Sequence, residues 1–345
     1  MSNDYLWDGS GTPDPDVQRL EALLGRLRST PPPLDFARGG PELVEGPVPQ
    51  LPDMPLRWRT LRYLAPMLAA AAVVAVMVGL TARSVRRSPF LDVAITKGRP
   101  RIGSTPVAGG GRMAVGQMLV TDGSSQARVN VSTIGYVDID PNTQVRLVET
   151  RDGRHQLSLA RGTLRAVITA PPGQFIVDTP SGTATDLGCA YTLHVDEDGA
   201  GLLSVTAGWV ALERNGRESF VPAGASCRTH PNLGPGTPRF DDASREIQEA
   251  LDEFDFGPDA SHRADALRFI LEHRDSADTV TLWHLVPRVE PAARGAVVDA
   301  LADQVAMPPG VTRDAILRLD RAALDLWWSE QGLGSAAWWR KWKNW

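Results

Sequence analysis

The stretch QARVNVSTIGYVDIDPNTQVRL, residues 126–147, carries the pattern that indicates the fold. Apolar and polar residues alternate in Ala127–Val131 and again in Val137–Asp140. A period of two places successive side chains on opposite faces of a β-strand. Pro141-Asn142, which lies between two such runs, is a pair typical of tight turns. The stretch therefore predicts short strands joined by turns.

The same pattern extends on both sides of this stretch, through residues 90–228. Gln156–Leu159 alternates in the same way, and turn signals recur at intervals of about 8–15 residues. Three of these signals are pairs that end in glycine, namely Asp122-Gly123, Asp152-Gly153 and Asn215-Gly216. No apolar stripe of helical length interrupts the series. Residues 88–240 are therefore predicted to form an all-β domain.

A series of short motifs, each a glycine turn or a piece of strand, runs through this β region. In order they are Val115-Gly116, Thr121-Asp122-Gly123, Ser125–Val129, Gly135–Val137, Asn142–Leu147, Leu159–Leu164, Phe175–Pro180, Val205–Val210 and Pro222–Gly224. The ordered series resembles the FecR domain, the extracytoplasmic module of membrane-anchored regulators of alternative sigma factors. The resemblance implies a twisted, solenoid-like β structure and a role in signal transduction.

Two features depart from the family pattern. Gly188-Cys189-Ala190-Tyr191 stands where the family usually has Gly-Thr before an aromatic residue. Residues 241–345 read as helical, unlike the small mixed α/β module with which iron-uptake FecR proteins contact an outer-membrane receptor. The resemblance therefore does not extend to that source of the signal.

An uncharged apolar run precedes the β region. It is YLAPMLAAAAVVAVMVGLTA, residues 63–82. A helix of that length reaches roughly 30 Å, the thickness of a bilayer core. A buried helix of a soluble domain is one alternative, although such a helix is seldom apolar on every face. A cleaved signal peptide is the other, although about 60 residues precede the run. We predict one transmembrane helix with its arginine flanks in residues 57–87.

Positive charge does not orient this span, because three arginines flank each end. The resemblance implies the orientation instead. It suggests a single-pass protein of the bacterial inner membrane, with residues 1–62 in the cytoplasm and the C-terminal domains, residues 83–345, in the periplasm. The lipid bilayer is then itself a partner. The modest net charge of −5 argues against nucleic-acid binding, because a surface for nucleic acid needs clustered lysines and arginines.

Residues 1–56 combine a helical signal with a proline-rich tether. Asp14-Pro15-Asp16 is a helix-start pattern, and apolar residues follow it at spacings of three and four. These residues are Val17, Leu20, Leu24 and Leu27. One apolar stripe on a short helix needs a partner surface, either residues 1–12 of the same chain or another protein. The resemblance implies that this other protein is a sigma factor or a related cytoplasmic regulator.

Residues 241–345 are predicted to form an all-α domain, because apolar residues recur there at helical spacing in four successive stripes. The stripes are Ile247, Leu251 and Phe254; Ala266, Leu267, Ile270 and Leu271; Leu282, Leu285, Val286 and Val289; and Val297, Val298, Leu301 and Val305. Antiparallel pairs resembling HEAT-like repeats fit this pattern. Tryptophans at 338, 342 and 345, beside basic residues, fit a helix at membrane headgroups or, as we favour, a helix docked on the acidic helices.

The sequence offers no pattern for a catalytic, metal or cofactor site. The six histidines include no His-Glu-x-x-His motif, and Gly109-Gly110-Gly111 lacks the Lys-Ser/Thr ending of a phosphate-binding loop. Asp196-Glu197-Asp198-Gly199 is interpreted as a solvated hairpin rather than a calcium loop. The chain is therefore predicted not to be an enzyme, and no cofactor or metal is predicted.

The chain has two cysteines, Cys189 and Cys227. Because thiols oxidise readily outside the inner membrane, we predict a disulfide between them. The alternative is a pair of buried, reduced thiols that act as small apolar side chains.

Two functions fit these observations. The first is a FecR-like single-pass inner-membrane signal transducer that regulates an alternative sigma factor in response to an unknown envelope protein or ligand. The alternative is a non-signalling cell-envelope scaffold or binding protein, in which the β domain and the helical array bind other molecules and no signal crosses the membrane.

Overall fold

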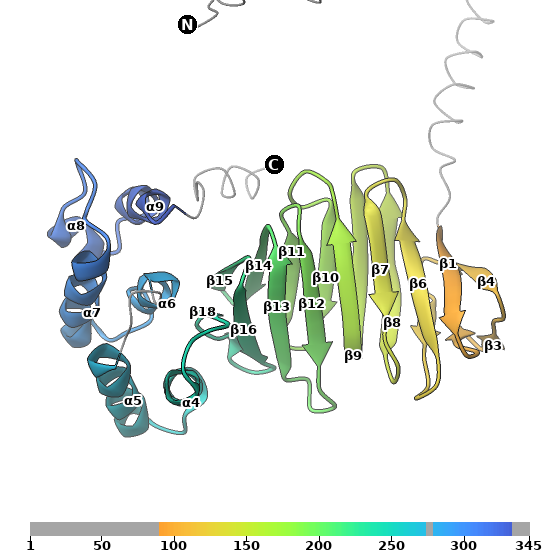
Figure 1. The fold of residues 1–345 in the computed structure, drawn as a ribbon, viewed down its shortest axis with the longest axis horizontal. Helices are drawn as coiled ribbons and strands as arrows, with labels where there is room; N and C mark the ends of the chain where they lie inside the picture. The colour runs from red at the N-terminus through yellow and green to blue at the C-terminus, as the bar shows by residue number, and fades with distance from the viewer. Residues whose placement is uncertain (1–89, 274–278, 333–345) are drawn as a thin grey trace, which may run out of the picture. The chain divides into compact units, whose positions relative to one another are not determined.

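The structure is a computed structural model that describes residues 90–273 and 279–332. Strands occupy the chain from Phe90 to Phe240, and helices follow from Arg245 (Figure 1). The predicted order, a β region followed by α-helices, is confirmed. The predicted membrane span, the N-terminal amphipathic helix and the tryptophan-rich end lie outside the described residues.

The strands form two facing sheets that share one long strand, β9 (Arg154–Ile168). The first sheet contains β1 (Phe90–Lys97), β4 (Gly110–Ala114), β6 (Gln126–Val131), β7 (Gly135–Ile139), β12 (Ala190–Val195), β13 (Gly201–Ala207), β16 (Ala225–His230), β17 (Gly234–Pro235) and β18 (Arg239–Phe240). The second contains β2 (Arg101–Ile102), β3 (Thr105–Pro106), β5 (Met118–Val120), β8 (Gln144–Arg151), β10 (Phe175–Thr179), β11 (Gly182–Asp186), β14 (Trp209–Arg214) and β15 (Arg217–Pro222).

The chain advances along the long axis of the strand array by alternating between the two sheets. Hairpin β6–β7 lies in the first sheet, β10–β11 in the second, β12–β13 in the first and β14–β15 in the second. Figure 1 shows this progression from β1 at one end of the array to the helices at the other. The arrangement agrees with the solenoid-like β structure that the resemblance implied.

Strand β9 passes from one sheet to the other at Gly162. Its first half pairs with β8 and β10, and its second half pairs with β7 and β12. Gly162 has φ +93°, and a Cβ placed there would lie 2.4 Å from Thr143 Oγ1. A side chain at this position would be both strained and blocked by its neighbour. Glycine is therefore what lets one strand serve both sheets.

The core between the sheets follows the predicted alternation. In β6, Ala127, Val129 and Val131 are buried, whereas Asn130 is exposed. The predicted turn Asn215-Gly216 joins β14 to β15, and both residues have positive φ, 51° and 79°. Positive φ at two central residues is the geometry of a type I′ turn, which matches the twist of the flanking strands.

The helices contain the predicted apolar stripes on their buried faces; for example, α4 buries Ile247, Leu251 and Phe254. The described helices are α4 (Arg245–Phe256), α5 (Ala260–Glu272), α6 (Thr279–Leu285), α7 (Pro291–Gln304), α8 (Arg313–Leu317) and α9 (Arg321–Glu330). Helix α4 packs on α5, and α6 packs on α7. Their lengths, from 5 to 14 residues, do not follow a regular repeat.

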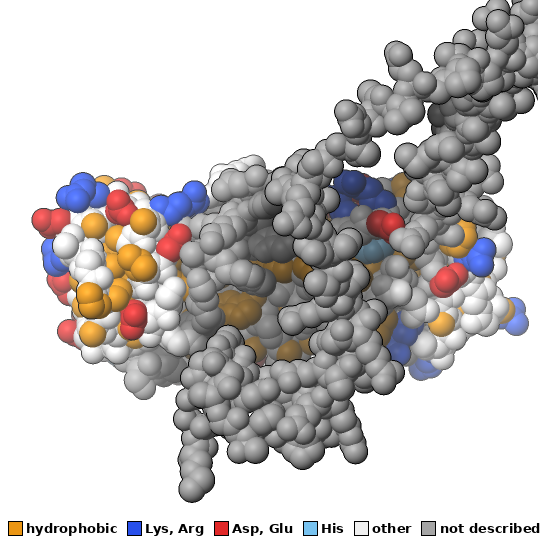
Figure 2. All heavy atoms as spheres, turned by 90° about the horizontal axis from the view of Figure 1, so that it is seen from above, with side chains coloured by type: hydrophobic (Ala, Val, Ile, Leu, Met, Phe, Trp, Pro, Cys, Tyr) orange, Lys and Arg blue, Asp and Glu red, His pale blue; other side chains and the backbone are white. Residues whose placement is uncertain are grey.

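Within the described ranges no helix combines the length and the apolar composition needed to cross a bilayer. On the face of the molecule drawn in Figure 2, the helical end carries acidic, basic and apolar side chains side by side.

Candidate binding site where the strands meet the helices

A second hydrophobic core joins the helices to the end of the strand array. Ala211 of β14 and Phe220 of β15 belong to this core together with the apolar faces of the helices. Trp328 of α9 lies at its centre, because its ring lies 5.7 Å from that of Trp209, 6.1 Å from that of Phe220 and 4.7 Å from that of Trp283. Aromatic pairs at these separations contribute beyond the area they bury.

His284 of α6 bonds directly to the backbone of β15. Its Nε2 accepts a hydrogen bond of 2.9 Å from the Phe220 N–H, and its Nδ1 donates to the Val280 carbonyl at 2.7 Å. Among the described strands, β15 pairs with β14 alone, so its outer edge needs such a partner. Burial, helped by the nearby Arg288 charge, lowers the pKa of His284 to about 3. His284 is thus a neutral structural link, without the exposed titratable form that acid–base catalysis needs.

Arg288, in the turn between α6 and α7, bonds to the same strand. Its guanidinium donates to the Glu218 carbonyl at 2.8 Å, to Ser219 Oγ at 2.6 Å and to Thr237 Oγ1 at 2.9 Å. Only 8% of this side chain is exposed. A buried guanidinium that donates to several oxygens fixes the position of the backbone around it.

Asp255 of α4 compensates the charge of this buried cluster. It forms an ion pair with Arg217, lies 3.6 Å from Arg288, and accepts a hydrogen bond of 2.5 Å from the Thr237 N–H. Only 2% of its side chain is exposed. Burial lowers the pKa of Arg288 to about 10, partly offset by Asp255, and the Arg217 charge lowers it further. Two arginines therefore share one buried carboxylate, which leaves the site with excess positive charge.

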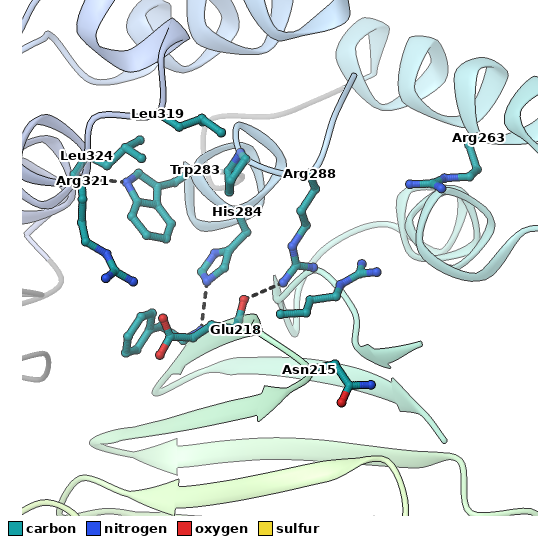
Figure 3. Close-up of a pocket in the computed structure, with 13 residues that line it drawn as sticks. Asn215, Glu218, Arg263, Trp283, His284, Arg288, Leu319, Arg321 and Leu324 are labelled. Atoms are coloured by element: carbon teal, nitrogen blue, oxygen red, sulfur yellow. Dashed lines mark hydrogen bonds between the residues drawn. The ribbon is translucent and has the colours of Figure 1, made fainter. Parts of the chain in front are cut away.

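A cavity of about 490 Å³ opens beside this cluster, between β15 and the helices. We call it the junction cavity. Its charged residues are four arginines and one acid: Arg217, Arg263, Arg288, Arg321 and Glu218. Figure 3 shows Arg321 from α9, Arg288 after α6 and Arg263 from α5 reaching it from three separate elements.

The junction cavity also has an apolar wall, formed by Phe220, Trp283 and Leu324. The Trp283 indole is fixed, because its Nε1 donates to the Leu324 carbonyl at 3.2 Å. Pockets of 300–1,000 Å³ that combine apolar walls with a few fixed polar groups are typical ligand sites. The junction cavity is therefore the candidate binding site of the described residues.

A second cavity, of about 530 Å³, lies between β16 and α4 and is a weaker candidate. Of the four acidic residues that line it, Asp252 is already paired with Arg228 and Arg239 at 3.1 Å each. Across the described ranges, no cluster of three or more histidine, cysteine or acidic side chains is arranged to hold a metal ion.

The predicted disulfide between Cys189 and Cys227 is wrong, because both cysteines are free and buried in the structure. Cys189 precedes β12 and Cys227 lies in β16, and these two strands flank β13 on opposite sides. Across the sheet alone, two strand spacings separate such residues by roughly 10 Å, already beyond the 7 Å that a disulfide can bridge. The spacing of the cysteines along the sequence could not reveal this register.

Each thiol has a different partner. Cys189 Sγ donates to Asp186 Oδ2 at 2.8 Å, and Cys227 Sγ donates to the Gly236 carbonyl at 3.2 Å. Burial raises the pKa of the Cys189 thiol far above its ordinary value and that of Cys227 to about 12. Burial also raises the pKa of Asp186 to about 6. Both thiols therefore stay protonated, which makes them poor nucleophiles.

The other predicted site residues, Val17, Leu20, Leu24 and Leu27, lie outside the described residues. Sequence reasoning missed the junction cavity because its four arginines come from four distant segments. One signal was available: His284 lies within the predicted apolar stripe of α6, where a polar ring needs a buried partner.

Comparison with known proteins gives one family match. Residues 117–211 match the sequence model of a family described as FecR protein. This region extends from β5 into β14 and ends before the helices. The resemblance to the FecR family is thereby confirmed for the middle of the strand array. No curated protein matches the chain.

Two solved structures are similar to the chain, both crystal structures of a candidate anti-sigma factor from Parabacteroides distasonis. Each is 17% identical to it, and the TM-scores are 0.32 and 0.33. The aligned part covers 39% of this chain in both cases, and 63% and 62% of the solved chains. The chain thus spans less than two thirds of the length of these neighbours.

Proposed function

We propose that this chain is a FecR-type regulator of an alternative sigma factor, held in the bacterial inner membrane by one helix. The FecR match over residues 117–211 is the observation that carries the proposal. The uncharged apolar run at residues 63–82, which precedes the matched region, supports a membrane anchor. FecR proteins are regulatory rather than enzymatic, and the proposal assigns no catalytic residue.

In this proposal residues 1–62 lie in the cytoplasm and residues 83–345 lie in the periplasm. The β region at 88–240 and the helices at 241–345 receive an envelope signal, from a protein or a small ligand. The signalling molecule causes release of the inner partner only if it binds more tightly to the state of the chain that has released this partner.

The apolar stripe Val17, Leu20, Leu24 and Leu27 is the proposed docking site for that inner partner. Apolar residues at spacings of three and four fill the groove of a partner as a row of anchors. A charge placed in the middle of such a row stays desolvated in the complex, which weakens binding strongly.

The experiment is co-purification of full-length chain from native membranes, with bound proteins identified by mass spectrometry. The test variant is Leu20→Asp with Leu24→Asp. The matched control is Gln18→Asp with Ala22→Asp, which adds the same charge on the opposite side of the predicted helix. A sigma factor should accompany the wild type and the control and be lost from the test variant.

Recovery of the same sigma factor with the test variant would refute the docking site. Recovery of envelope proteins alone, with no sigma factor, would refute the regulatory function and favour the scaffold. Reporter fusions near residues 50 and 240 test the topology separately. A reporter that is active only in the cytoplasm should work at position 50 and fail at position 240.

A further inference from the structure

We propose that the junction cavity binds a small organic acid, a carboxylate attached to an apolar ring or chain. The inference does not depend on the sigma-factor proposal, because it rests on the cavity alone. The carboxylate would lie among the arginines, and its apolar part would lie against the aromatic wall.

Positive charge predominates in the cavity. Four arginines face one glutamate there, and the buried Asp255 behind them compensates only part of the excess. Arg263 contacts the Phe254 ring, 5.4 Å from its centroid, and this contact supplies no counter-charge. An anion bound there would balance part of this charge and accept hydrogen bonds from the guanidinium groups.

The geometry favours a carboxylate attached to an apolar group. Guanidinium groups present paired N–H donors that match the two oxygens of a carboxylate. Phe220, Trp283 and Leu324 form an apolar wall, and a bare inorganic anion has no apolar part to pack against it. The volume of about 490 Å³ suits a molecule larger than such an ion.

An extended peptide is a poorer fit, because the edge of β15 is already occupied. Strand addition needs free backbone groups on that edge. The Phe220 N–H is bonded to His284 and the Glu218 carbonyl is bonded to Arg288. Figure 3 shows both bonds as dashed lines on the strand side of the cavity. Recognition must therefore come from side chains.

The test is isothermal titration of the full-length chain in phosphatidylcholine nanodiscs, with empty nanodiscs as the blank. The probes are indole-3-acetate and 4-phenylbutyrate. Two further compounds test the ring and the carboxylate separately. Tryptophol has the indole ring without the charge, and acetate has the charge without a ring. At least one of the two probe acids should bind, about tenfold or more tighter than either part alone.

The test variant is Arg263→Gln with Arg321→Gln, because neither residue belongs to the buried cluster. The matched control is Arg268→Gln with Arg318→Gln, which removes two exposed arginines outside the cavity from the same region. Affinity for the acid should fall at least about tenfold in the test variant and stay unchanged in the control. If the double variant unfolds, Arg321→Gln alone is measured instead, and it should weaken binding by a smaller factor.

Three results would overturn the proposal. The first is the absence of binding by both acids up to millimolar concentration. The second is equal affinity of the test variant and the control. The third is tryptophol binding as tightly as indole-3-acetate, which would show an apolar site with no role for the arginines.

Discussion

The two ends of the strand array are closed in different ways. At the first end the sheets finish in short strands, β3 with two residues and β4 with five. Pro106 in β3 and Gly110-Gly111 in β4 are residues that make a poor template for further pairing. At the other end the helices cover β15, and His284 and Arg288 bond to its backbone. The first end is protected from further strand pairing because its edge strands are short. The edge of β15 is protected because its backbone groups are already hydrogen-bonded to the helices.

The difference shows where the molecule places buried polar groups. At the first end the ion pair of Arg112 with Asp92 is exposed, with 68% of each side chain accessible. At the helical end Arg288 and Asp255 are almost fully buried. Charges in a low dielectric interact strongly and are destabilising when left unpaired. The helical end should therefore be rigid and sensitive to substitution, and it is also where the junction cavity lies.

Asp255→Ala should have the largest effect, because it leaves Arg217 and Arg288 buried without their counter-charge. We expect a loss of about 3–5 kcal/mol in the free energy of unfolding. Denaturant unfolding followed by circular dichroism measures this change. Asp299→Ala is the control, since it breaks the exposed pair with Arg313 and should shift the midpoint far less. Equal shifts would show that burial of the ion pair does not increase its effect on stability.

His284→Ala should have the next largest effect. It leaves the Phe220 N–H buried without an acceptor, which costs about 1–3 kcal/mol. His284→Gln keeps an oxygen that can accept this bond, so it should restore part of the loss. The same unfolding experiment gives both values. If His284→Gln is as damaging as His284→Ala, the hydrogen bond is not the source of the stability.

His284 also predicts a pH dependence. The unfolded chain binds a proton on this histidine near pH 6.5, whereas its folded pKa is lowered to about 3. Between these two pH values the unfolded state therefore binds more protons than the folded state. The free energy of unfolding decreases as the pH falls below 6.5. Asp186, with its folded pKa raised to about 6, acts in the opposite direction, gaining stability on acidification.

Comparison with His284→Gln separates the two groups, because Asp186 is present in both proteins. Between pH 7.5 and 5.5 the wild type should lose about 1 kcal/mol more than the variant. Chemical unfolding at the two pH values measures the difference. Parallel loss in both proteins would mean that His284 does not resist protonation in the folded state.

Arg112→Ala, at the first end, should have the smallest effect. The Arg112–Asp92 pair is exposed at 3.3 Å, and the guanidinium lies over the Phe90 ring at 4.5 Å. We expect a loss below about 1 kcal/mol, further reduced by added salt. A loss as large as that of Asp255→Ala would remove the contrast between the two ends.

Much of the fold could be predicted from the sequence, because its signals are local. Alternation in Ala127–Val131 and the Asn215-Gly216 turn depend on neighbouring residues, and both gave the observed strands and hairpin. Apolar spacing likewise identified the buried face of α4.

The candidate site could not be predicted, because it depends on long-range register. The spacing of Cys189 and Cys227 gave no sign that β13 separates their strands. Arg217, Arg263, Arg288 and Arg321 each look like an ordinary surface arginine in the sequence. Only the packing of α5, α6 and α9 beside β15 brings them around one cavity.

Hydrogen exchange at single-residue resolution, compared between the outer edges of β15 and β4, tests most directly whether the helices seal the strand array at one end. The Phe220 amide should exchange about as slowly as amides of the interior strand β13, because its bond to His284 opens only with the helices. Outward amides of β4 (Gly110–Ala114) should exchange much faster. Equal, fast exchange at Phe220 and in β4 would show that the helices do not seal the edge of β15.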